Sequence, residues 1–145
     1  MPEWVQRATA EYQKRMPVQY RFRLIEIAAS KRSRNGNVDN YREDESTRLL
    51  SRAPKNAWLV ALSRAGQGKD SAALSELFRQ CQRDNHELCF LIGGADGLST
   101  SCLRQSHAVW SLSAMTLAHP VVRVVLAEQL YRAWSILEHK PYHRG

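Results

Sequence analysis

The chain has 145 residues, of which 43% are hydrophobic and 24% charged, a composition typical of a globular protein the size of one domain. No apolar run approaches the roughly 20 residues that cross a membrane, and the charged start MPEWVQRATAEYQKRM lacks the apolar core of a secretion signal. The excess of 21 basic over 14 acidic residues gives a net charge of +7. This charge favours a polyanionic partner such as nucleic acid, with a generically soluble basic protein as the alternative.

The first predicted element is a helix over residues 2–16. Trp4, Ala8, Tyr12 and Met16 recur every four residues on one face, and Pro17 follows as a helix terminator. The next run, RFRLIEIAA, alternates in part as a strand does and is rich in residues that favour strands. We therefore predict a strand after the first helix.

A loop and a second helix are expected next. Residues 30–40 are basic and polar and contain Gly36, which predicts a loop. The second helix should run from about residue 39 to residue 52, with Leu49 and Leu50 as its main apolar anchors.

Three short apolar runs predict buried strands: AWLVAL at 57–62, LCFLI at 88–92, and residues 109–112. Uninterrupted apolar runs of this length are typical of strands covered on both faces, as in parallel sheets. A polar loop, SRAGQGKD, and a helix with Leu74, Leu77, Phe78 and Cys81 on one stripe separate the first two runs, and a short helix over 99–106 separates the last two. The alternation predicts one α/β domain, residues 1–145, with a largely parallel sheet and helices on both faces.

The three cysteines, Cys81, Cys89 and Cys102, show no paired spacing. A disulfide framework or a zinc site would need closer pairs or histidines at matching positions. We expect free thiols in a reducing cytoplasm, no metal site and no membrane association. The absence of H-E-x-x-H and G-x-S-x-G sequences also disfavours a metal enzyme and a triad hydrolase.

The candidate ligand site lies in the loops that follow Leu62, Ile92 and Leu112. Ligands of open α/β sheets bind beyond the carboxyl ends of the strands, and small residues in these loops let the backbone approach a ligand closely. The sharpest signal is GGADG at 93–97, which can equally be turn geometry alone. It lacks the G-x-G-x-x-G spacing of a dinucleotide site, and no Walker sequence is present.

The stretch WSLSAMTLAHPVVRVVLAEQLYRAW, residues 110–134, combines a small-residue loop, a turn at His119–Pro120 and an apolar helix. The loop composition indicates a backbone that lines a pocket. Arg123 lies inside the apolar helix, where an unpaired charge would be costly. It either pairs with Glu128 or extends to solvent, or it faces the pocket loop or a phosphate.

Taken together, LIGGADGLS, the 110–134 stretch and the closing PYHRG resemble the RlmH-type methyltransferases of the SPOUT class. Those enzymes methylate N3 of a pseudouridine in bacterial 23S ribosomal RNA. The resemblance extends over essentially the whole chain from MPEWV onward. It implies a C-terminal trefoil knot, S-adenosylmethionine bound in the knot loops, and homodimers whose active sites are each completed across the interface. The implied substrate is large-subunit ribosomal RNA or the assembled ribosome.

The resemblance also carries residue roles to this chain. The cofactor-binding positions are Leu62, Gly93, Leu112, Ser113, Ala114, Met115, Thr116 and Leu117. The catalytic and substrate-side positions are His119, Arg123, Tyr142, His143 and Arg144. Among these, His143 would accept the proton from N3, and Arg123 or Arg144 would hold a phosphate or carbonyl oxygen.

Two departures from the family pattern stand out. Members begin with an additional strand and a short Val-Gly turn ahead of MPEWV, which this sequence lacks, so a sheet edge is expected to be open. Members usually also carry an acidic residue directly after the leucine that corresponds to Leu62, where this chain has Ser63. The main rival function is a non-catalytic basic RNA-binding module, and a nucleotide-dependent enzyme that uses GGADG ranks last.

Overall fold

A sheet of three parallel strands forms the centre of the computed structural model, which describes residues 1–31 and 36–144, except the side chains of His143 and Arg144. The strands β1 (Ala57–Gly68), β2 (Glu87–Ile92) and β3 (Ala108–Ser111) are arranged in the order β2-β1-β3. Val60 and Ala61 in the middle of β1 have no exposed surface. The apolar runs thus become strands that are covered on both faces, as predicted.

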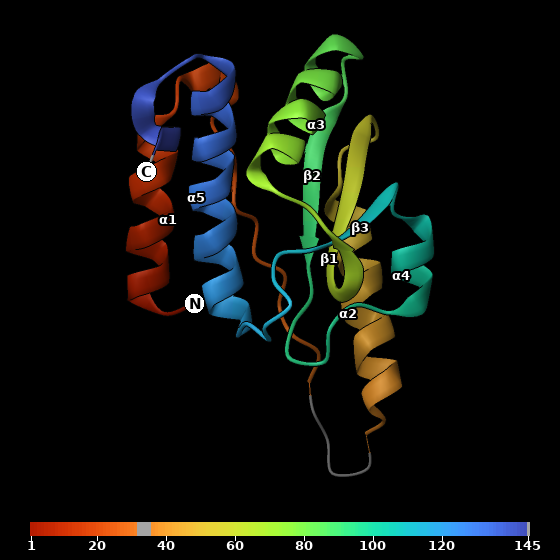
Figure 1. Ribbon diagram of the computed structural model, residues 1–145. Coiled ribbons are helices and arrows are strands. Elements are labelled where there is room, and N and C mark those ends of the chain that lie inside the picture. The colour runs from red at the N-terminus through yellow and green to blue at the C-terminus, as the bar shows by residue number, and fades with distance from the viewer. Residues whose placement is uncertain (32–35, 145) are drawn as a thin grey trace.

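Five α-helices are described, and they cover both faces of the sheet. They are α1 (Glu3–Arg15), α2 (Val38–Arg52), α3 (Ser71–Arg83), α4 (Thr100–Gln105) and α5 (His119–Leu137). Figure 1 shows α5, with α1 outside it, on one side of the sheet and α2 with α4 on the other. The α/β prediction is therefore confirmed, whereas the trefoil knot stays a prediction.

The core lies between the sheet, α3 and α5. Its buried members are Val60 and Trp110 from the strands, Leu74 from α3, and Leu126, Leu130 and Ala133 from α5. Asp70 caps α3 by accepting a hydrogen bond from the amide of Ala73 at 2.8 Å. None of the helices in the described part of the chain has the length and apolar character needed to cross a bilayer.

The buried face of α1 differs from the one that its spacing predicts. Val5 and Thr9 are buried, whereas Trp4 remains 49% exposed. The hydroxyl of Thr9 donates to the carbonyl of Val5 at 2.9 Å, which satisfies this polar group inside the interface. The four-residue spacing therefore predicts the helix correctly and its rotation incorrectly, by about one residue.

The predicted strand over residues 21–29 is wrong in its pairing. This segment follows the 3₁₀ turn Val18–Tyr20 and is extended, but it pairs with none of the three strands. Leu24 and Ile25 consequently remain 40% and 42% exposed. A strand needs a neighbour for its backbone hydrogen bonds, and none of the three strands pairs with this segment.

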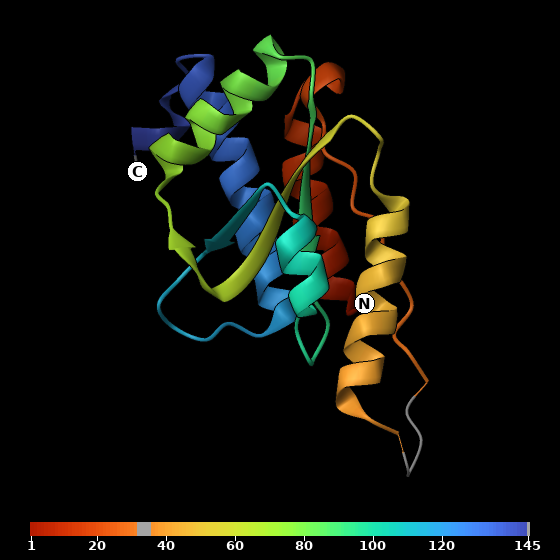
Figure 2. The same cartoon turned by 90° about the vertical axis from the view of Figure 1, so that its right-hand side faces the viewer.

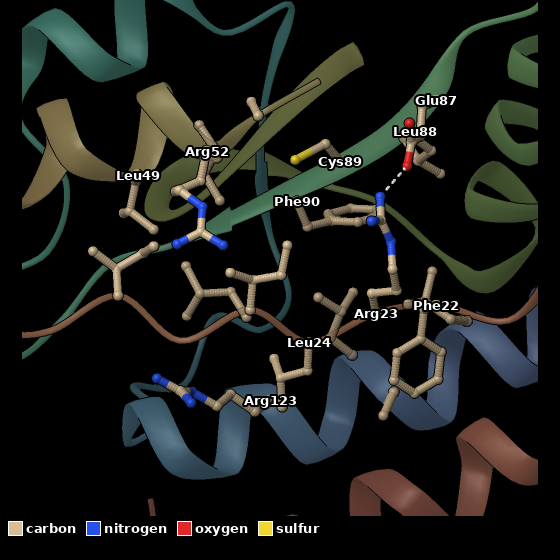
Figure 3. Close-up of a pocket in the computed structure, with 18 of the residues that line it drawn as sticks. Phe22, Arg23, Leu24, Leu49, Arg52, Glu87, Leu88, Cys89, Phe90 and Arg123 are labelled. Atoms are coloured by element: carbon tan, nitrogen blue, oxygen red, sulfur yellow. Dashed lines mark hydrogen bonds and ion pairs between the residues drawn. The ribbon is translucent and has the colours of Figure 1, made fainter. Parts of the chain in front are cut away.

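A groove of about 580 Å³ separates this segment from the outer edge of β2. Figure 3 shows β2 and the segment running side by side with apolar side chains between them. The ion pair of Arg23 with Glu87, at 2.6 Å, spans the gap near one end. Within the described residues no strand pairs with this edge of β2.

Strand β1 is longer than predicted, because residues 63–68 continue it after an irregularity instead of forming a loop. Both Leu62 and Gln67 are in register with Trp110, so the intervening residues bulge out of the ladder. A Cβ on Gly66 would lie 2.7 Å from backbone atoms of Val109 and Trp110. Only a glycine at position 66 lets β1 pass this close to β3.

We predict that Gly66→Ala destabilises the fold by about 1–3 kcal/mol, because the added methyl group meets backbone that cannot rotate away. Gly68→Ala is the matched control, since a Cβ there has no neighbour within 4 Å. Urea unfolding followed by circular dichroism measures both. Equal stability of the two variants would show that β1 does not pass β3 as closely as described.

Candidate functional site

The structure brings two of the three predicted ligand-binding loops, those after β2 and β3, to the same end of the sheet, where the residues after Leu62 form the irregularity in β1. Leu62 is in register with Ile92 on one neighbouring strand and with Trp110 on the other. Gly93 and Leu112 therefore follow β2 and β3 on either side of Leu62. This is the end of the sheet at which the carboxyl ends of its parallel strands lie, and α/β proteins bind their ligands there.

The glycine loop that follows β2 folds back on itself. A Cβ on Gly93 would lie 2.6 Å from the carbonyl carbon of Gly97, and the Gly97 amide donates to the carbonyl of Gly94 at 3.0 Å. Gly97 has φ of +77°, a conformation that favours glycine. Gly93 and Gly97 are thus required by geometry, and the loop offers backbone with no side chain at these positions.

The loop after β3 is held by its own serines. The Ser111 hydroxyl donates to the carbonyl of Ser113 at 2.9 Å, and the Ser113 hydroxyl accepts from the amide of Met115 at 2.9 Å. Ala114 and Thr116 are exposed, and Met115 is 77% exposed although it is a large apolar residue. A fixed turn that displays apolar side chains is suited to contact a ligand or a partner.

Next to this loop is a cavity of about 260 Å³. Leu112 and Trp110 line it from the β3 side, and the first turn of α3, with Asp70 and Ser71, lines the opposite side. The Ser71 hydroxyl donates to the side-chain oxygen of Gln129 on α5 at 2.5 Å. The cavity therefore has apolar walls with a few oriented polar groups, the usual composition of a small-molecule site.

The first turn of α5 lies at one end of the groove beside β2. His119 is the first residue of α5, and it lines the groove together with Gly93 and Arg123. The Arg123 guanidinium is 17% exposed and forms an ion pair with Glu26 at 2.8 Å. The Glu128 alternative is wrong, because Glu128 pairs with Arg132 one turn later, at 2.7 Å. Figure 3 shows Arg123 on the α5 side of the groove.

The tail that carries the predicted C-terminal site residues packs along α5, away from these loops. The helix has 19 residues and is thus about 28 Å long. Beyond its far end, the turn Pro141–Arg144 places Tyr142 against Tyr131, with ring centroids 4.6 Å apart. The side chains of His143 and Arg144 lie outside the described residues. Within one chain, Tyr142 therefore does not meet the loops at the sheet edge.

Tyr142 also does not act as a base at neutral pH. Burial, together with a hydrogen bond with Tyr12, raises the pKa of the Tyr142 phenol to about 12. The phenol consequently stays protonated and acts as a hydrogen-bond donor rather than a base. The guanidinium of Arg132 lies 5.0 Å from the centre of its ring, which further fixes the turn against α5.

The cysteines provide no activated nucleophile. Burial is the main cause that raises the pKa of the Cys81, Cys89 and Cys102 thiols above the ordinary value, so all three remain protonated at neutral pH. The described residues also include no group of three or more histidine, cysteine or acidic side chains placed to hold a metal ion.

Sequence reasoning missed the contribution of α2. The Arg42 side chain donates to the carbonyl of Asp96 at 2.8 Å, and the Ser46 hydroxyl accepts from the amide of Ser99 at 2.9 Å. These contacts join segments more than 50 positions apart. No local spacing in the sequence signals them.

Comparisons with known proteins give one consistent result. A family model described as Predicted SPOUT methyltransferase matches residues 1–143. The Ribosomal RNA large subunit methyltransferase H of Hydrogenovibrio crunogenus is 41% identical over 99% of this chain and 92% of its own length. Proteins of the same name from Coxiella burnetii and Thioalkalivibrio sulfidiphilus are 40% and 43% identical over 99% of this chain, and 93% and 92% of their own lengths are covered.

Gly93→Ala and Gly94→Ala form a matched pair that tests the glycine loop. A methyl group on Gly93 meets the Gly97 backbone, whereas one on Gly94 meets only a side-chain oxygen of Glu45, 3.3 Å away, which has to shift by a few tenths of an ångström. We expect Gly93→Ala to open the loop and speed amide hydrogen exchange at Gly97 at least about tenfold, by loss of roughly 1.4 kcal/mol or more. Gly94→Ala should exchange nearly as the wild type does. Similar exchange in both variants would contradict the close contact of Gly93 with Gly97.

Proposed function

The chain belongs to the SPOUT methyltransferase family, and from this premise we propose that it methylates large-subunit ribosomal RNA at N3 of a pseudouridine, with S-adenosylmethionine as the methyl donor. One observation carries the proposal. Leu62, Gly93 and the 112–117 loop lie side by side at the carboxyl ends of the strands. The names of the relatives, which match almost the whole chain, support ribosomal RNA as the substrate.

The residues at this end of the sheet fit such a donor. Gly93 and Gly97 leave the backbone of one loop bare, Leu112 lines a cavity with apolar walls, and exposed Met115 provides an apolar cover. Bound S-adenosylmethionine would supply a methyl group on a positively charged sulfonium, which transfers by displacement. For such a reaction the protein has to align the partners and exclude water, which backbone-lined apolar walls do well.

The acceptor nitrogen carries a proton that has to leave as the methyl group arrives. We assign its removal to His143, because a histidine titrates near neutral pH and can act as a base there. Tyr142 does not take this role, since its pKa is about 12. Arg144 and Arg123 would favour the deprotonated imide or hold a phosphate. Arg123 first has to exchange Glu26 for the RNA.

Two chains are needed to assemble this set of residues. The loop residues and His119 lie at the start of α5, whereas Tyr142 packs on Tyr131, which is about 18 Å further along the helix by its rise per residue. We propose a homodimer in which the tail of one subunit reaches the sheet edge of the other. The isologous contact of a two-fold dimer would then give two equivalent composite sites.

The net charge of +7 supports a nucleic-acid substrate in the cytoplasm. Binding to RNA should weaken steeply as salt is added, because each phosphate contact releases counterions. No specific contact in the structure favours the alternative of a non-catalytic RNA-binding module, and donor binding separates the two possibilities.

The direct test is methyl transfer from labelled S-adenosylmethionine to ribosomes from cells that lack the endogenous methyltransferase. We expect one modified pseudouridine, mapped by mass spectrometry, and donor binding by calorimetry. Calorimetry without heat from either S-adenosylmethionine or S-adenosylhomocysteine would reject the enzyme in favour of a binding module. A methyl group at another base would reject only the pseudouridine assignment.

Mixing two inactive variants tests the composite site. Gly93→Ala impairs the donor loop, and deletion of residues 141–145 removes the tail. In an equal mixture, half of the dimers are mixed and each has one intact site, so about one quarter of wild-type activity should return. Each variant alone is the control. No recovery, with mixed dimers present by native mass spectrometry, would place the tail in its own subunit's site.

A further inference from the structure

Helix α2 buries polar residues where a surface helix usually buries an apolar stripe. Ser46 is 1% exposed and Glu45 is 9% exposed, while Leu49 and Leu50 are only half-buried. Burying a polar group costs free energy unless it is hydrogen-bonded. The contacts of this polar face therefore indicate what α2 does in the fold.

The polar face of α2 contacts the segment from Gly94 to Ser99. Arg42 donates through Nε to the carbonyl of Asp96 at 2.8 Å, and Ser46 accepts from the amide of Ser99 at 2.9 Å. A Cβ on Gly94 would lie 3.3 Å from a carboxylate oxygen of Glu45. Consecutive turns of one helix thus hold the middle and the end of a segment that begins directly after Gly93.

The Ser46 contact continues into α4. Ser99 is the N-cap of α4, and its hydroxyl accepts from the amide of Cys102 at 3.1 Å. The Ser46 side chain also hydrogen-bonds with the Cys102 thiol, which is fully buried. Helix α4 is the element that α2 contacts most, and Figure 2 shows the two helices on the same side of the sheet.

The loop itself is rich in glycine. Its internal hydrogen bond from Gly97 to Gly94 and the close approach of Gly93 to Gly97 define the fold-back, but three glycines give the loop many alternative conformations. Contacts from α2 restrict those alternatives. Preorganisation of this kind reduces the entropy lost when a ligand binds.

We propose that Arg42 and Ser46 are positioning residues for the methyl donor: from α2 they hold the 94–99 segment in the conformation that receives it. The inference rests on the proposed function for the identity of the donor. Neither residue contacts the reacting atoms. Their effect passes through the carbonyl of Asp96 and the amide of Ser99.

The test compares Arg42→Gln and Ser46→Ala with the wild-type protein. Loss of one hydrogen bond that holds the loop should raise the dissociation constant for S-adenosylhomocysteine about tenfold, measured by calorimetry. In methyl transfer, the KM for the donor should rise in parallel while the KM for the ribosome stays unchanged. Arg42→Lys keeps a cationic donor and should recover part of the affinity.

Arg48→Gln is the matched control on the same helix. Arg48 bonds to Ser30 and Asp44 and not to the glycine loop, so this variant should bind the donor as the wild type does. Equal losses in Arg48→Gln and Arg42→Gln would mean that α2 matters only for general stability and would overturn the inference. Unchanged affinity in both loop-directed variants, with circular dichroism showing that they are folded, would overturn it as well.

Amide hydrogen exchange at Gly97 separates this inference from the proposed function. If α2 positions the loop, exchange at Gly97 is faster in Arg42→Gln and Ser46→Ala than in Arg48→Gln. If the wild-type chain bound no donor, the proposed function would fail while the exchange rates still reported on the loop. Equal exchange rates in all three variants would reject the positioning role directly.

Discussion

Parallel pairing of β1 on both of its edges is the constraint on which the candidate site depends. Parallel strands point their carboxyl ends in one direction, so pairing with β2 and β3 brings the loops that follow these two strands to the same end of the sheet, beside Leu62. The close passage of Gly66 by Val109 and Trp110 makes this possible on the β3 side. The core between Val60, Leu74 and Leu130 then fixes α3 and α5 relative to that end.

Much of the fold can be predicted from local sequence patterns. Strands that are buried on both faces appear as uninterrupted apolar runs, and helices appear as apolar residues at helical spacing. AWLVAL and LCFLI become β1 and β2, and the predicted helix follows Asp70. The same reasoning fails for residues 21–29, whose composition suits a strand although no neighbour pairs with them. Strand propensity describes a segment, whereas pairing depends on a partner elsewhere in the chain.

The candidate site is likewise predictable from the sequence only in part. Gly93 and the 112–117 loop are visible in the sequence, because small residues directly after a buried strand leave the backbone open to close approach. The partner of Arg123 is not visible: Glu26 lies 97 positions away, while the nearer Glu128 pairs with Arg132. The contacts of Arg42 and Ser46 with the glycine loop are equally nonlocal. Only the fold decides which of several nearby charges or hydroxyls becomes a partner.

The open edge of β2 has a consequence for the behaviour of the protein in solution. Its backbone amide and carbonyl groups lie beside a groove with apolar walls and beside the exposed side chains of Leu24 and Ile25. An edge of this kind is a template for strand addition between molecules, the first step of many aggregation reactions. Arg23 and Glu87 place charges across one end of it, where charged side chains act as gatekeepers. The colloidal stability of the protein thus depends on the same groove that His119 and Arg123 line at one end.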